Sequence, residues 1–124
     1  MMKIFINLFL IQPVIEYFIH IYLHKSKFNN IHKKHHIEIH DKTYENNLQT
    51  SFNICLMFTP LLYFRNGYII LMGITKYQMI HCCLHIYPNI FSKLSKFHLK
   101  HHQVPNKNYG VTAMWPDKLF GTFI

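Results

Sequence analysis

Residues 73–102 read GITKYQMIHCCLHIYPNIFSKLSKFHLKHH, and in this stretch an apolar segment ends in two groups of histidines. In the first group, His81 and His85 stand four residues apart, and the second group follows the pattern HxxHH over residues 98–102. On a helix, residues spaced by three or four project from one face. Each group therefore predicts a helix face on which imidazoles lie close together.

The first half of the chain repeats this order. His20 and His24 stand four residues apart at the end of an apolar segment, and residues 32–36 read HKKHH. The full order HxxxH, HxxHH, HxxxH, HxxHH uses ten of the eleven histidines and leaves His40 over as a solvent-exposed residue. Histidine tracts that bind metal unspecifically are contiguous and polar, whereas these groups adjoin apolar segments. We therefore predict ten metal ligands: His20, His24, His32, His35, His36, His81, His85, His98, His101 and His102.

Ten ligands exceed what one ion accepts, so the set predicts two metal ions. Imidazole suits iron, zinc, copper and nickel. A structural zinc site takes four ligands, usually with paired cysteines, and the three cysteines here lie in apolar stretches without such pairing. Two irons held by neutral nitrogens could activate dioxygen beside apolar segments that deliver a lipid chain.

Two apolar regions predict membrane contact. The first covers about residues 4–23, close to the ~20 residues that a helix needs to cross the hydrocarbon core, and Pro13 permits a kink in it. Within this region, Glu16 and His20 should face a protein interior or a polar site, because a polar group that faces lipid is costly. The second region is interrupted by residues 65–67, RNG, and predicts a helical hairpin that is either shallow or crosses fully.

We expect a single domain over residues 1–124. It consists of an apolar helix at about 4–23, a histidine-box loop at 25–51, a helical hairpin at about 52–87 and a C-terminal histidine-box cap at 92–124. The expected fold class is all-α: an integral-membrane helical protein with a histidine-rich cytosolic cap that holds a di-metal centre.

The net charge of +8 favours contact with an anionic membrane surface. Most lysines lie in residues 25–42 and 93–118, and both stretches adjoin apolar runs, as cytosolic loops of membrane proteins do. The sequence carries no fold signature of a nucleic-acid module, so we expect no nucleic-acid partner.

Several motifs together resemble the fatty acid hydroxylase and sterol desaturase superfamily. They are Glu16-Tyr17, the two HxxHH boxes, Asn108-Tyr109-Gly110 and the run DKLFGT over residues 117–122. Residues 73–122 are similar to the fatty acid 2-hydroxylase branch, whereas residues 32–36 resemble the boxes of sterol desaturases and sterol methyl oxidases at least as well. The resemblance covers about residues 12–122.

This resemblance implies that the ten histidines bind two irons and that the enzyme uses O2; zinc is the ion expected to substitute for iron on isolation. It also implies an electron donor such as cytochrome b5 with its reductase, a lipid substrate, and a place in the endoplasmic reticulum membrane with the histidine boxes facing the cytosol. The expected product is a hydroxylated or desaturated lipid, with a fatty acyl chain as the favoured substrate. The alternatives are a sterol desaturase or methyl oxidase type of activity, a catalytically inactive relative, or a metal-handling membrane protein.

Three further residues carry open expectations. Glu16 either orients a ligand histidine or is a carboxylate near the membrane surface. Tyr109 and Trp115 are expected to anchor the protein at the membrane surface, in preference to lining a lipid path.

Overall fold

The computed structural model describes residues 2–26, 32, 35–36 and 43–124, and over 43–48 it describes the backbone alone. In this part of the chain the regular structure is helical and there is no strand, which confirms the expected all-α class. The position of His40 lies outside the described residues. The elements in chain order are α1 (Met2–Ile6), η1 (Asn7–Ile11), α2 (Gln12–Lys25), α4 (Thr43–Met57), η3 (Thr59–Tyr63), α5 (Gly67–Ile86), α6 (Ser92–Gln103) and α7 (Trp115–Phe120).

The first apolar region forms one continuous rod from α1 through η1 to α2. Its middle element η1 is a π-helical turn, after which the Gln12 N–H donates to the carbonyl of Asn7. Pro13 follows at the start of α2 and has no N–H to donate, and its ring would crowd the carbonyl four residues earlier in a regular helix. The wider π-helical turn accommodates the missing hydrogen bond and the ring of Pro13, so the helical rod continues past Pro13.

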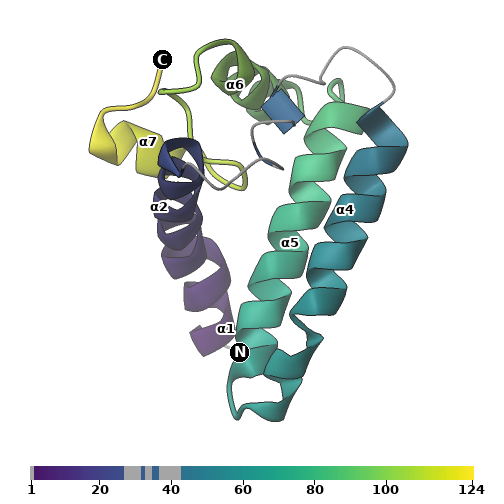
Figure 1. The fold of residues 1–124 in the computed structure, drawn as a ribbon. Helices are drawn as coiled ribbons and strands as arrows, with labels where there is room; N and C mark the ends of the chain where they lie inside the picture. Colours follow the sequence, from purple (N-terminus) through teal and green to yellow (C-terminus); the bar gives the residue numbers. More distant parts are fainter. Residues whose placement is uncertain (1, 27–31, 33–34, 37–42) are drawn as a thin grey trace.

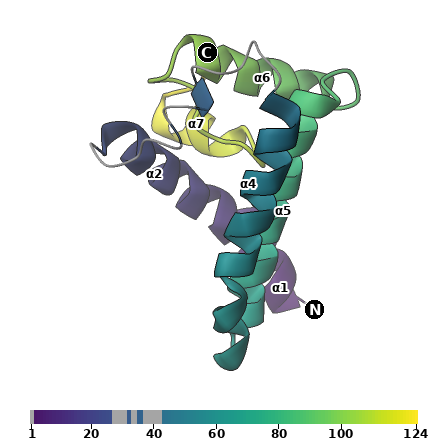
Figure 2. The same ribbon diagram turned by 45° about the vertical axis from the view of Figure 1, so that its right-hand side comes forward.

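The helical hairpin consists of α4 and α5, which lie antiparallel and side by side (Figures 1 and 2). They are joined by η3 and the turn that ends at Asn66. Helix α4 begins at Thr43, inside the segment expected to be a loop. Ser51 of α4 makes polar contacts across the hairpin. Its hydroxyl donates to Oε1 of Gln78 and also contacts Sγ of Cys82, both on α5.

Within the described residues, two helical stretches are long and apolar enough to cross a membrane, Met2–Lys25 and Gly67–Ile86. Only 22% and 17% of their most apolar windows are buried inside the protein. A core helix of a soluble protein would be mostly buried, so this exposure supports contact with lipid. Helix α4 has 15 residues, fewer than the ~20 that a full crossing needs.

The rod and the hairpin form a V (Figure 1). Near the closed end, Gly73 on α5 lets the rod approach: a Cβ at this position would lie 3.3 Å from Cγ of Gln12. Nε2 of Gln12 donates to the Gly73 carbonyl, and Nζ of Lys76 donates to the carbonyl of Leu8. At the open end, α6, α7 and the loop between them form a cap (Figures 1 and 2).

The interior beneath this cap is unusually polar. Its buried apolar side chains include Leu84 and Val111, but at least as many buried side chains are polar or charged: Glu16, His20, Ser95, His98, His101, Asn108 and Asp117. Glu16 and His20 are 6% and 2% exposed, so both face the interior, as expected. Buried polar groups of this kind are retained only where they are paired or bind something.

Candidate metal centre

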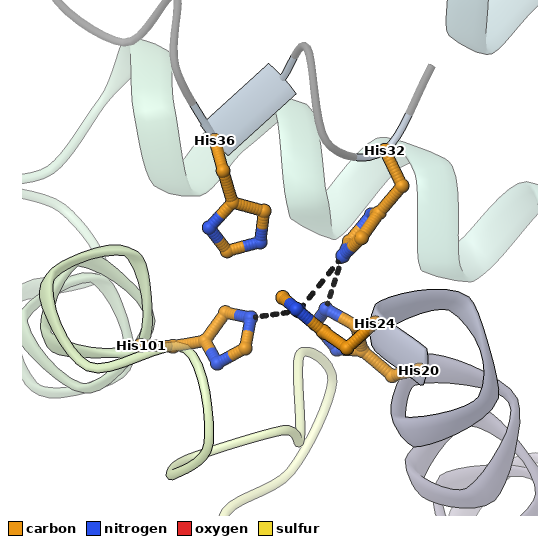
Figure 3. Close-up of side chains that lie close together, drawn as sticks. All are labelled: His20, His24, His32, His36 and His101. Carbon is orange, nitrogen blue, oxygen red and sulfur yellow. Dashed lines mark hydrogen bonds between the residues drawn. The ribbon is translucent and has the colours of Figure 1, made fainter. Parts of the chain in front are cut away.

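All ten predicted histidines lie at the open end of the V. His20 and His24 end α2, His81 and His85 end α5, three more lie on α6, and the others lie in the segment between α2 and α4. They form two groups of five whose ligand atoms lie within 4.8 Å of one another in each group, and each group could hold a metal ion. The first group is His20, His24, His32, His36 and His101, and the second is His35, His81, His85, His98 and His102 (Figure 3 shows the first group).

The spacing of the ring nitrogens matches a shared ion. Five pairs of Nε2 atoms, three in the first group and two in the second, are 2.9–3.1 Å apart. Two nitrogens that each lie ~2.1 Å from one ion, at a right angle, would be about 3.0 Å apart. The donor set therefore fits a metal ion at the centre of each group.

Two histidines of the first group have their ring tautomer set by the backbone. Nδ1 of His20 lies 2.5 Å from the carbonyl oxygen of Tyr109, and Nδ1 of His101 lies 2.6 Å from that of Lys107. A carbonyl oxygen only accepts hydrogen bonds, so both Nδ1 atoms carry the proton. Each neutral ring then keeps a lone pair at Nε2, and both Nε2 atoms point into the group.

Hydrogen bonds alone cannot satisfy this arrangement. The Nε2 contacts run from His20 to His32, from His32 to His24 and from His24 to His101 (Figure 3), and both ends of this chain are acceptors. Each contact needs one donor and one acceptor, so a chain of three contacts must begin and end with opposite roles. With acceptors at both ends, one contact always joins two donors or two acceptors. A bound cation would remove the conflict, because each of these four histidines could then offer it the lone pair of its Nε2.

A protonated histidine would also remove the conflict, but burial opposes it. Desolvation, aided by neighbouring histidines, lowers the pKa of His32 to about 3, and desolvation lowers that of His101 to about 4. His20 is almost fully buried, where an added positive charge would be costly. The rings are therefore neutral near pH 7, which is the form that binds metal.

The second group is arranged around His98 on α6. Its Nε2 lies 3.0 Å from Nε2 of His85 and 3.0 Å from Nε2 of His102, and its ring centre lies 4.8 Å from that of His81. The two groups adjoin each other, since the ring of His36 in the first lies 4.3 Å from that of His102 in the second. Two ions would thus be held side by side.

The sequence spacing and the grouping follow one rule. Among the ten ligand histidines, every pair four residues apart stays in one group, as His20 and His24 do. The extra histidine of each HxxHH box crosses to the other group: His35 joins the second, and His101 joins the first. Neighbouring residues on a helix point about 100° apart, so an adjacent pair such as His101 and His102 can reach two different ions.

The loop that supplies the carbonyl to His20 is held by two buried carboxylates. Asp117 accepts from the N–H groups of Tyr109 and Gly110, both over 2.7 Å. Oε1 of Glu16 accepts from the N–H groups of Val111 and Thr112, over 3.0 and 2.7 Å. Four successive backbone N–H groups are thereby bound by two side chains.

These contacts correct two expectations. Glu16 does not accept from a histidine and is not exposed at the protein surface, because its carboxylate is buried and accepts from the loop after Tyr109. Tyr109 is not a surface anchor, since it is 7% exposed and its ring packs 5.6 Å from that of His101. The histidine spacing could not have found Asp117 or Gly110, and the only signal for them was their place in the motifs of the resemblance.

Two exposed apolar helices that each end in clustered imidazoles define a class of protein, that of a helical membrane protein with histidine metal sites. The family comparison agrees, because the family model described as fatty acid hydroxylase matches residues 5–122. The chain therefore belongs to the fatty acid hydroxylase family, whose activity at the family level is that of a hydroxylase- or desaturase-type lipid oxygenase. No match was found among curated proteins or among solved structures.

Proposed function

We propose that this protein is a membrane-bound, non-haem di-iron oxygenase that hydroxylates or desaturates a lipid, with a fatty acyl chain as its substrate. The observation that carries the proposal is the pair of adjoining five-histidine groups at the open end of two helices that are long and apolar enough to cross a membrane. The family match supports it.

The chemistry of the donors favours iron used for catalysis. Five nitrogens per group exceed the four of a structural zinc site and are one fewer than the six ligands of an octahedral ion. When bound, two irons would supply the activation of dioxygen. The protein's own residues hold the ions, set the ring tautomers of His20 and His101 through backbone carbonyls, and keep the centre buried.

The balance of the reaction requires an electron donor. In a hydroxylation, one atom of O2 enters a C–H bond and the other leaves as water, which consumes two electrons and two protons. We propose cytochrome b5 with its reductase, or a similar carrier, as the source. The setting proposed is the endoplasmic reticulum membrane, with the cap in the cytosol.

Lipid mass spectrometry tests this proposal. The chain would be expressed in a host with its own cytochrome b5 reductase chain, beside His101→Ala and, as a matched control, His40→Ala. We expect wild type and the control to form a lipid species that has gained one oxygen or lost two hydrogens, and His101→Ala to form none. The mass and fragmentation of the product would separate an acyl chain from a sterol.

Two results would contradict the proposal. Full product formation by His101→Ala would overturn the role of the first group. Two bound metals in the wild type with no oxygen-dependent product, in a host that supplies electrons, would favour the inactive or metal-handling alternative.

A further inference from the structure

The peptide unit between Tyr109 and Gly110 is hydrogen-bonded on both of its sides. Its carbonyl oxygen lies 2.5 Å from Nδ1 of His20, and its N–H donates to Oδ2 of Asp117 over 2.7 Å. The C=O and N–H of one peptide are conjugated, so a carboxylate at the N–H makes the carbonyl a stronger acceptor. Two hydrogen bonds thus connect Asp117 to the ring of His20 through this peptide, and the unprotonated Nε2 of that ring is the metal-binding atom.

We infer that Asp117 is a positioning residue for His20, acting through the Tyr109–Gly110 peptide. Histidines that bind metal usually donate their second ring N–H to a carboxylate or to a backbone carbonyl, which fixes the ring and raises its basicity. Here a backbone carbonyl is backed by a carboxylate. The inference rests on the proposed metal centre and assigns a role to a residue outside its ligand set.

The surroundings of Asp117 fit this role. Its side chain is fully buried, and both oxygens are used: Oδ1 accepts from the Tyr109 N–H and the Thr122 hydroxyl, and Oδ2 accepts from the Gly110 N–H. The close approach depends on Gly110, because a Cβ there would lie 2.8 Å from Oδ2 of Asp117.

His101 offers an internal comparison. Its acceptor is the carbonyl of Lys107, and the N–H of the same peptide, on Asn108, donates to the carbonyl of Thr122 over 3.0 Å. The final acceptor behind His101 is therefore a neutral carbonyl, whereas the final acceptor behind His20 is the carboxylate of Asp117. Of these two histidines, only His20 therefore has a carboxylate behind the carbonyl that accepts from its ring.

Two isosteric substitutions distinguish a role of Asp117 in positioning His20 from a role in holding the loop in place. In Asp117→Asn, one oxygen becomes an NH2 group, which cannot accept from the backbone N–H that it faces. In Glu16→Gln, the remaining oxygen can still accept from the N–H groups of both Val111 and Thr112, because Oε1 alone serves them. The new NH2 group replaces Oε2 and can donate to the Thr112 hydroxyl, so only the 3.3 Å contact with Nε2 of Gln12 is lost. Glu16→Gln is thus the matched control for Asp117→Asn.

The test is the rate at which zinc leaves the protein. The full chain, purified in detergent and loaded with Zn²⁺, would be mixed with a chelator, and the release of metal followed over time. We expect two zinc ions per chain in the wild type. In Asp117→Asn, one ion should leave about 10–100-fold faster while the other keeps its rate. Glu16→Gln should behave like the wild type, and Asp117→Asn should have no further effect when added to His20→Ala.

The outcomes distinguish this inference from the proposed function. Unchanged release in Asp117→Asn, or equal acceleration of both ions, overturns the positioning role and leaves a two-metal centre standing. A wild type that binds no zinc overturns the metal centre and this inference together. If Asp117→Asn does not fold, ¹⁵N NMR of the zinc-loaded wild type decides: Nδ1 of His20 should be protonated and hydrogen-bonded, and an unprotonated Nδ1 overturns the inference.

Discussion

Gly110 lies where the loop passes between Ala113 and Asp117, and it has no room for a side chain. A Cβ would lie 2.1 Å from the carbonyl oxygen of Ala113 and 2.8 Å from Oδ2 of Asp117. We expect Gly110→Ala to push the loop aside and to lower the free energy of unfolding by about 1–3 kcal/mol. Thermal unfolding in detergent would measure this change.

Gly121 provides the control for that substitution. It adopts a left-handed conformation with φ 73°, and a Cβ there would meet nothing within 4 Å. Asparagine tolerates this conformation, so Gly121→Asn should unfold close to the wild-type temperature. If Gly110→Ala also unfolds there, the close packing of the loop is not needed for stability.

Two histidines of the first group, His32 and His101, predict how the stability of the metal-free protein depends on pH. The pKa values of His32 and His101 fall from an ordinary 6.5 to about 3 and about 4 on folding. The unfolded chain therefore binds more protons as the pH falls below 6.5, and stability decreases with it. We expect the unfolding temperature of the metal-free protein to be highest above pH 6.5 and to fall between pH 6.5 and 4. A variant with glutamine at both positions should fall less steeply, and a flat profile in the wild type would contradict the prediction.

At the scale of elements, the packing of α5 against the rod depends on Gly73. The Gly73 carbonyl accepts from Gln12, and a Cβ would already be a tight contact at 3.3 Å from Cγ of Gln12. We expect Gly73→Leu to force the two elements apart and to lower the free energy of unfolding by about 1–3 kcal/mol. The same thermal measurement applies.

Ile70 on the same helix is the matched control, because its side chain is 56% exposed. Ile70→Leu should leave the unfolding temperature unchanged. Equal stability of Gly73→Leu and the wild type would show that the closed end of the V tolerates a wider spacing.

At the scale of the whole molecule, the charges of the described residues are distributed unequally between the two ends. The closed end carries Lys3 and Arg65, whereas the open end carries Lys25 and the lysines of the cap: Lys93, Lys96, Lys100, Lys107 and Lys118. Basic residues favour the cytosolic side of a membrane. We expect the cap to face the cytosol and the hairpin turn to face the opposite side.

Glycosylation mapping would check this orientation. A flexible loop with an acceptor sequon, inserted between Arg65 and Asn66, should be glycosylated in the endoplasmic reticulum. The same loop inserted between Pro88 and Asn89, at the open end, should stay unmodified. The reverse pattern would invert the orientation, and modification at neither position would contradict a crossing by α5.

The sequence by itself determined the helical class, the apolar segments and the set of ten histidines that the structure brings together. These features depend on local rules: helical periodicity, side-chain polarity and the chemistry of imidazole. The same rules missed that α4 begins at Thr43, because residues 43–51 carry few apolar side chains to show a helical period. They also did not predict the π-helical turn before Pro13.

Only the tertiary structure decided how the ten histidines divide. The crossing of His35 and His101 between the groups depends on where four separate segments meet. The acceptor of His20 is a carbonyl 89 residues away, and the family motif of residues 117–122 marks the carboxylate behind it, Asp117, without showing what it contacts. Contacts between such distant residues are set by the packing of whole elements, and no local pattern records them.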